Sequence, residues 1–566
     1  MPELLTARIL RQISPSALRC GIFCTLIVLS PGTVLADAVE KSSAASQGRS
    51  ASVLAASNAS TATIGAVNII NGSVFNLDDP EEDKALYRLA NKLHIKTRPA
   101  VIQQQLLFRP GDPVSPRELE ESERILRSNR FIQEASIEPV AKGNGSVDVN
   151  VRTTDVWTLL PRFSLSRSGG KNHSGIGVKE MNLLGSGVQL EALYKSNVDR
   201  DSTIIKFADH NLGSSWYSLD ASYANSSDGQ TYQLGFGKPF YALDTKSAFG
   251  LSILEYDQVD SLYNRGEIMG QFEHSGSTYE VFKGWSDGLD DGWTKRFLVG
   301  MAYDEHQFAE ALDSTAPISV APEDRKLVYP FAGIEFMQDR FEKTENHDQI
   351  NRTEDRYLGT RLSARLGYAS TSFGSDRDAW VLNAGAQTGF GSSEKHSLVL
   401  ASDFATRIED GGLRNALLGA SAKYYNRQSD KRLFYASLSG TYGRNLDIDD
   451  QVLLGGDSGL RGYPLRYQAG DKSALLTLEQ RFFTDWYPWR LFRVGGAVFF
   501  DAGRTWGRSP VSDGNNKLLR DIGFGLRIGN PRSGHARMTH IDLAFPLDGD
   551  KSIKNVQLVV ETRKGF

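Results

Sequence analysis

From about residue 157 to residue 566 the sequence consists of short segments in which apolar and polar residues alternate. Glycine, asparagine and aspartate separate these segments. In 522–528 the large apolar residues occupy the even positions, and glycine and arginine occupy the odd ones. A period of two indicates strands with one apolar and one polar face. Many segments run for about eight to eleven residues, about the length that a tilted strand needs to cross a bilayer. The pattern predicts a mainly β protein that ends in an antiparallel transmembrane β-barrel.

A soluble β-sandwich also alternates, so a second feature has to separate the two folds. Aromatic residues gather near segment ends, as in Asp-Trp-Tyr-Pro-Trp at 485–489, and such belts mark membrane interfaces. The mean hydropathy of −0.34 is compatible with half-polar barrel strands. No run of about 18 apolar residues occurs, which excludes a helical membrane protein. The net charge of −4 gives no electrostatic case for nucleic acid as a partner.

Residues 1–36 have the pattern of a secretory signal peptide. Three arginines precede a short apolar run at 21–29, and Val-Leu-Ala ends at Ala36. Nine apolar residues are too few for a membrane anchor. Both cysteines, Cys20 and Cys24, lie in this segment. The sequence after it therefore excludes disulfides, a thiol nucleophile and thiolate metal sites.

Residues 37–83 are rich in alanine and serine and predict a flexible leader. Residues 84–156 then have the texture of a small α/β domain. The stretch 87–95 fits a first strand, although its spacing also fits a helix, and a helix is expected over 99–107. Ser115 and Pro116 have the pattern of a helix start, with the serine as N-cap. Strands are expected near 131–140 and 147–152, joined by a Gly-rich turn.

This order of elements resembles a single POTRA (polypeptide-transport-associated) domain. The resemblance depends on Phe-Arg-Pro-Gly at 108–111, the apolar stripe of 119–126, Arg130-Phe131 and the closing strand 147–153. These are spacing patterns, and any other small α+β domain remains an alternative reading of the segment.

The C-terminal residues form a further alternating strand. Val556, Leu558 and Val560 share the parity of the terminal Phe566. A last strand that ends in an aromatic residue resembles the signal by which outer-membrane barrels are recognised for insertion. Val560 and Phe566 are therefore predicted to belong to such an insertion signal.

A glycine-rich motif, Leu-Leu-Gly-Gly-Asp-Ser-Gly-Leu-Arg-Gly-Tyr, occupies 453–463. It is followed by a strand-like segment at 474–482 and by Val-Gly-Gly-Ala-Val-Phe-Phe-Asp-Ala-Gly at 494–503. Together with Asn-Leu-Leu-Gly-Ser-Gly at 182–187, the set closely resembles the BamA/TamA-like outer-membrane assembly factor superfamily. This group is also called the bacterial surface antigen family, and it includes two-partner secretion transporters.

The resemblance implies a barrel of sixteen strands over 157–566 that follows one periplasmic POTRA domain at 84–156. It also implies that the motif is the tip of a long loop that folds back into the barrel. Arg461 would then be the tip arginine, and Asp501 on a strand facing the lumen would be its partner.

Elementary electrostatics supports the same pair. An ionised Asp501 facing lipid would be costly, so it should face the lumen and be paired. An arginine fork fits a carboxylate with two parallel hydrogen bonds. Glu479 lies on the polar face of the preceding strand and joins the predicted lock. The other predicted members are Gly459 and Gly462, which permit a tight tip, and Tyr463, which can pack on the wall. The alternative is a solvated loop arginine and an unrelated lumen carboxylate.

No enzyme pattern accounts for the chain. The Gly-Asp-Ser-Gly at 456–459 resembles a serine-protease signature, but no matching histidine element accompanies it, and the loop motif explains the serine. No His-Glu-x-x-His arrangement and no P-loop occur in the sequence. The expectation is a non-enzymatic protein without a cofactor or metal.

The predicted function is therefore that of an outer-membrane protein of a Gram-negative cell that inserts or translocates client polypeptides. The POTRA domain would receive unfolded outer-membrane or secreted clients. The lipid bilayer is a further expected partner, and periplasmic accessory proteins or chaperones are candidates. A single POTRA domain departs from the several domains of essential assembly factors and from the usual two of secretion transporters. The alternatives are a two-partner secretion transporter, a passive pore or surface antigen, and a soluble exported β-protein.

Overall fold

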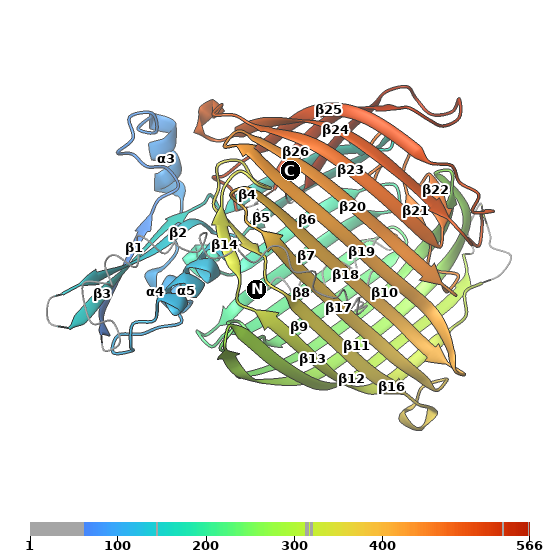
Figure 1. Ribbon diagram of the computed structural model, residues 1–566, viewed down its shortest axis with the longest axis horizontal. Helices are drawn as coiled ribbons and strands as arrows, with labels where there is room; N and C mark the ends of the chain where they lie inside the picture. Colours follow the sequence, from blue (N-terminus) through green and yellow to red (C-terminus); the bar gives the residue numbers. More distant parts are fainter. Residues whose placement is uncertain are drawn as a thin grey trace, which may run out of the picture.

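The computed structural model describes residues 62–566 except 143–144, 312–315, 317–320, 535–536, 564 and 566. A small α/β domain lies at one end of a large barrel (Figure 1). The predicted signal peptide, the first part of the predicted leader and Phe566 lie outside the described residues.

In the described part of the chain, twenty strands close into one antiparallel barrel, so the predicted number of sixteen was wrong. The barrel strands are β4 (Leu159–Ser168), β5 (Lys171–Glu180), β6 (Gln189–Ser196), β7 (Asp201–Leu212), β8 (Tyr217–Ser226), β9 (Gly229–Lys238), β10 (Ser247–Asn264), β11 (Glu267–Asp290), β12 (Trp293–Glu310), β13 (Arg325–Gln338), β16 (Arg361–Ala369), β17 (Ala379–Gly391), β18 (His396–Glu409), β19 (Gly412–Ser429), β20 (Arg432–Arg444), β23 (Lys472–Phe483), β24 (Arg493–Trp506), β25 (Leu519–Gly529), β26 (Met538–Pro546) and β27 (Gln557–Arg563).

The alternation of the sequence becomes the two faces of the wall. On β25, Ile522, Phe524 and Leu526 are exposed on the outside, whereas Asp521 and Arg527 are buried inside the barrel. β24 follows the same rule, and its odd positions, Asp501 included, face inward. The outer face is thus apolar and the inner face polar, as in barrels that span a lipid bilayer.

The barrel closes where its last strand meets its first. β27 pairs with β26 along its whole length, from Gln557 to Arg563. Its register with β4 holds the single pair Val560–Arg167. We call this junction the seam. Since a strand pair is stabilised along its length by ladder hydrogen bonds and side-chain pairs, the seam is the weakest junction in the wall.

The small domain is a three-stranded sheet in the order β1-β3-β2, with helices packed against it. Its elements are β1 (Thr63–Gly72), α3 (Ala85–Leu93), α4 (Pro99–Gln103), α5 (Pro116–Ser128), β2 (Ile132–Ala141) and β3 (Ser146–Asp155). Placing residues up to 83 in a leader was therefore wrong, because 63–72 form a strand parallel to β3. The alternative reading of 87–95 as a helix is the one that the structure supports.

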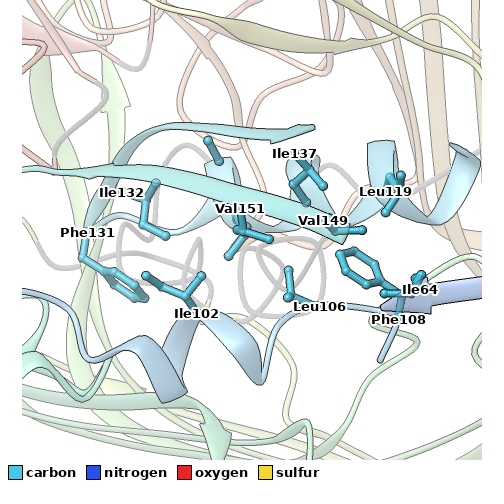
Figure 2. Close-up of a cluster of buried hydrophobic side chains, with 12 residues drawn as sticks. Ile64, Ile102, Leu106, Phe108, Leu119, Phe131, Ile132, Ile137, Val149 and Val151 are labelled. Atoms are coloured by element: carbon cyan, nitrogen blue, oxygen red, sulfur yellow. The ribbon is translucent and has the colours of Figure 1, made fainter. Parts of the chain in front are cut away.

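The core of the small domain lies between the sheet and helices α4 and α5 (Figure 2). Val149 and Val151 from the central strand β3 meet Ile102 of α4 and Leu126 of α5. The hydroxyl of Ser115 accepts a hydrogen bond from the backbone N–H of Glu118 (3.4 Å), which is the predicted N-cap of α5.

The remaining elements lie in turns and loops of the barrel. They are the hairpin β14 (Phe341–Thr344) and β15 (Glu354–Tyr357), the short strands β21 (Val452–Leu454) and β22 (Gln468–Gly470), and the 3-10 turns Leu183–Gly185, Thr371–Phe373 and Pro488–Arg490. Among the residues that the structure describes, no helix is long and apolar enough to cross a membrane.

Candidate functional site

The loop between β20 and β23, residues 445–471, carries the predicted motif and folds into the barrel. β21 and β22 pair within it, and Leu454 of β21 packs with Leu460, Tyr463 and Leu519 in one buried cluster. This cluster holds the tip of the loop against the inner faces of strands near the C-terminus of the chain.

Arg461 at the tip binds the inner wall of β24. Its Nε lies 2.7 Å and its Nη2 3.1 Å from the two carboxylate oxygens of Asp501, so the contact is bidentate. Its Nη1 lies 3.4 Å from Asp542 and 3.6 Å from Glu479. The guanidinium also stacks on the Phe499 ring, 3.3 Å from its centre. The structure thus places Arg461 among three carboxylates on three different strands.

These charges form a buried and nearly balanced cluster. Arg527 donates to Asp542 and lies 3.5 Å from Glu479. Arg481 lies 3.7 Å from the same glutamate. A buried charge is costly unless it is paired. The tip arginine is therefore part of the charge balance of the wall itself.

Two glycines let the tip approach the wall. Gly459 has φ +117°, a conformation that other residues adopt at a cost. A Cβ on Gly462 would lie 2.7 Å from Cβ of Asp521, so only glycine lets its N–H donate to that carboxylate (3.1 Å). Tyr463 is fully buried, and its hydroxyl donates to the carbonyl oxygen of Arg520 (2.6 Å).

Arg466, which the sequence reasoning missed, is a second anchor of the loop. It binds both carboxylate oxygens of Asp199, at 2.6 and 2.7 Å, in the turn between β6 and β7. It also lies over the Tyr263 ring of β10. Its position in the glycine-rich loop, three residues after the tip tyrosine, could have identified Arg466 as a second anchor.

The loop consequently spans the seam. Arg461 and Tyr463 hold it to β24–β26 on one side. On the other side, Arg466 binds the β6–β7 turn, and the backbone of Pro464 and Leu465 packs on Gly169 in the turn after β4. The loop therefore links the two sides of the junction that is poorest in strand pairing.

A second segment, residues 339–360 between β13 and β16, enters the barrel from the opposite end. We call it the proximal segment, since it lies next to the small domain. It contains the hairpin β14–β15. Ile350 is buried among Leu433, Phe483 and Met538 of the wall. Arg481 donates to the carbonyl oxygen of His347 (2.8 Å) and to Asp348 (3.0 Å).

The proximal segment also binds helix α5 of the small domain. Arg127 makes a bidentate contact with Asp355, with Nε–Oδ2 at 2.8 Å. Lys343 pairs with Glu123, and the Arg124 guanidinium lies 4.2 Å from the centre of the Phe341 ring. The sequence reasoning did not identify this segment, since its many charged residues are typical of a solvated loop.

Together the two segments form a line of ion pairs through the barrel. It runs from Arg127 to Asp355, and then from Asp348 of the same segment through Arg481 and Glu479 to Arg461. Each step is between 2.5 and 3.7 Å. The small domain and the tip of the opposite loop are thus connected by charged side chains and one short hairpin.

The structure describes one of the two residues that were predicted to belong to the C-terminal insertion signal. Val560 lies on β27 and forms the one registered pair of the seam. Phe566 lies outside the described residues. In the proximal segment, the centre of the His347 ring lies 4.3 Å from the centre of the Tyr425 ring.

Three solved structures are similar to this chain over most of its length. BamA from Haemophilus ducreyi lacking POTRA domains 1–3 is 13% identical, with a TM-score of 0.39, and covers 88% of this chain and 84% of its own. CdiB from Acinetobacter baumannii is 14% identical (TM-score 0.45; 89% and 73% covered). CdiB from Escherichia coli is 13% identical (TM-score 0.46; 89% and 76% covered). No family model and no curated protein matches the sequence.

Proposed function

We propose that this protein inserts unfolded polypeptides into, or translocates them across, the outer membrane of a Gram-negative cell. The observation that carries the proposal is the seam, a junction of one residue pair that a charged loop spans from inside. A wall that is closed elsewhere by long strand pairings has one place where it opens at low cost.

The small domain is suited to receive the client in the periplasm. Its order of elements, one strand, three helices and two strands, resembles the order predicted for a POTRA domain with one helix more, and β2 lies at an edge of its sheet. An extended polypeptide binds such an edge through main-chain hydrogen bonds, whatever its sequence. The proximal segment and its ion pairs place this domain at the opening of the barrel.

The apolar outer face of the wall supports the placement in a membrane. Phe163 and Leu165 on β4 are 78% and 81% exposed, next to the seam. Such exposure is costly in water and favourable in lipid. No step of the proposed mechanism requires nucleotide hydrolysis or a bound metal.

A disulfide across the seam tests the proposal. Arg167→Cys with Val560→Cys joins the one registered pair of β4 and β27. In a background with Cys20→Ser and Cys24→Ser, these are the two cysteines of the chain. The matched control is Leu165→Cys with Ser174→Cys, a pair between β4 and β5.

The readout is the insertion of an unfolded outer-membrane protein into vesicles that contain the purified chain. We expect that the oxidised seam variant no longer accelerates insertion and that a reductant restores its activity. The variant with the control pair should stay active when it is oxidised. If the oxidised seam variant is as active as the control, the proposal that the seam opens is wrong. If the protein conducts ions but never accelerates insertion or export, it is a passive pore.

A further inference from the structure

Helix α3 of the small domain exposes a row of leucines. Leu86, Leu89 and Leu93 are 66%, 52% and 64% exposed, and their spacing places them on one face of the helix. These leucines do not belong to the domain core, because Tyr87 on the adjacent face of α3 makes the contact with the rest of the protein. An exposed row of large apolar residues indicates a surface that another partner covers.

The orientation of α3 is fixed against the barrel end. The Tyr87 hydroxyl donates to the carbonyl oxygen of Trp489 (2.8 Å), and its ring stacks on Phe75. Leu491 and Trp157 pack against the same cluster. Figure 1 shows α3 beyond the barrel end, beside the turn that precedes β24. The leucine row therefore belongs to the rim of the barrel.

That rim carries the residues of a membrane interface. Trp486 and Trp489 in the turn 484–492 are 63% and 72% exposed. Tryptophan is enriched where headgroups meet the acyl chains. From Trp157 in the α3 cluster the chain continues directly into β4, whose outer face is apolar. The exposed leucines are thus next to the surface of the barrel that faces lipid.

The other exposed face of α3 carries basic side chains. Arg88 and Lys92 lie on the helix and Lys84 directly precedes it; all three are exposed, and Arg88 pairs with Asp83. A helix with a leucine face and Lys/Arg side chains beside it is suited to lie in the headgroup region, with its basic side chains reaching phosphate.

We propose that α3, with Trp486 and Trp489, is an interfacial anchor that binds the phospholipid leaflet on the small-domain side of the barrel. The proposal rests on the membrane placement of the barrel proposed above, and not on the handling of polypeptides. It implies that the membrane itself holds the small domain at a fixed orientation beneath β23–β24 and the first barrel strand.

Depth-dependent quenching of a fluorophore tests this anchor in the full chain. In the background without Cys20 and Cys24, an environment-sensitive dye is attached at Leu89→Cys. The protein is placed in phosphatidylethanolamine/phosphatidylglycerol vesicles whose lipids carry a nitroxide either near the headgroup or near the end of the acyl chain. Phe524→Cys on the outer face of β25 is the positive control, and Glu138→Cys on β2 is the negative control.

We expect the dye at Leu89 to be quenched severalfold more than at Glu138, and more by the shallow nitroxide than by the deep one. An interfacial helix buries its apolar face by only about 5–10 Å. Leu86→Ser with Leu93→Ser should reduce this quenching while leaving that at Phe524 unchanged.

Three results would overturn the anchor. If Phe524 is quenched and Leu89 is no more quenched than Glu138, the helix does not bind lipid, while the membrane placement stands. If quenching at Leu89 survives both serine substitutions, the leucine row is not what binds. If Phe524 itself is not quenched, the membrane placement fails, and the anchor fails with it.

Discussion

Loop 445–471 and the proximal segment enter the barrel from opposite ends, and each ends in a cluster of charged groups. The tip of the loop is surrounded by the wall alone, and both Arg461 and Asp501 are buried. The proximal segment joins two bodies, and Lys343, which binds α5, is half-exposed. Burial makes the first contact expensive to break, whereas solvent screens the Lys343–Glu123 pair of the second. The loop is therefore built as part of the wall, whereas the proximal segment joins the small domain through one buried pair, Arg127–Asp355, and one half-exposed pair.

The largest expected effect comes from removing the charge at the tip. Arg461→Met leaves Asp501 buried without its bidentate partner, and such a loss costs about 3–5 kcal/mol. We expect the temperature at which the folded barrel loses its compact band on SDS gels to fall clearly. Arg520→Met, which removes an exposed pair with Asp548, should have little effect. An equal loss of thermal stability in both variants would show that the buried ion pair contributes no more than the exposed one.

Reversal of the tip pair sharpens this result. Arg461→Glu combined with Asp501→Arg restores opposite charges, but the new glutamate still faces Asp542 and Glu479. We therefore expect partial recovery of thermal stability relative to Arg461→Glu alone. Full recovery would mean that the neighbouring carboxylates do not matter, and no recovery would mean that the pair does not act as a unit.

Cutting the link between the two segments should have an intermediate effect. Arg481→Met removes hydrogen bonds to His347 and Asp348, and because the Asp348 side chain is 40% exposed, water replaces part of what is lost. We expect faster proteolysis within 345–353 and a moderate loss of thermal stability. Arg432→Met, at an exposed position on β20, is the control. Unchanged proteolysis in Arg481→Met would contradict the role of this arginine in holding the segment.

The order of the proximal segment should depend on pH. Burial, followed by the nearby Asp348 carboxylate, raises the pKa of Glu354 from its ordinary 4.5 to about 7. A raised carboxyl pKa stabilises the fold below the unfolded value, and this contribution is lost as the pH rises through about 7. We expect more protection from protease at pH 5 than at pH 8, and a smaller difference in Glu354→Gln. If Glu354→Gln shows the same pH dependence of protease protection, another titratable group causes it.

The smallest effect on the barrel is expected at the contact with α5. Asp355→Asn weakens the bidentate contact with the buried Arg127, but neither residue belongs to the wall, so the thermal stability of the barrel should change less than in the variants above. The small domain should nevertheless move more, as measured by the width of the distance distribution between spin labels at Glu138 and Phe524. Glu138→Cys/Phe524→Cys without the asparagine change is the reference. An equally narrow distribution in both would show that other contacts hold the domain.

Much of the wall and of the tip could be predicted because each depends on local rules. Alternation placed Asp501 on the inner face, and the family resemblance implied Arg461 as its partner, which the cost of an unpaired carboxylate supported. The strand count could not be obtained this way. Closure is set by pairing around the whole ring, and long strands such as β11 contain several segments that look like separate short strands.

The missed elements depend on partners far along the chain. β1 follows an Ala/Ser-rich stretch and becomes a strand because it pairs with β3, about 80 residues later. Its apolar positions Ile64, Val67 and Ile69 were the available signal. In the proximal segment, Asp348 and Asp355 look like solvated loop residues until the barrel supplies Arg481 and the small domain supplies Arg127.

One of the two strands that meet at the seam is also short. β27 has seven residues, which at about 3.3 Å per residue rise about 23 Å, and less when tilted. This is below the roughly 30 Å thickness of a hydrocarbon core, whereas β11 with 24 residues far exceeds it. In the membrane placement proposed above, lipids next to the seam would compress or reorder to match so low a wall. The bilayer would then be thinnest and least ordered beside the junction where the sheet holds together least.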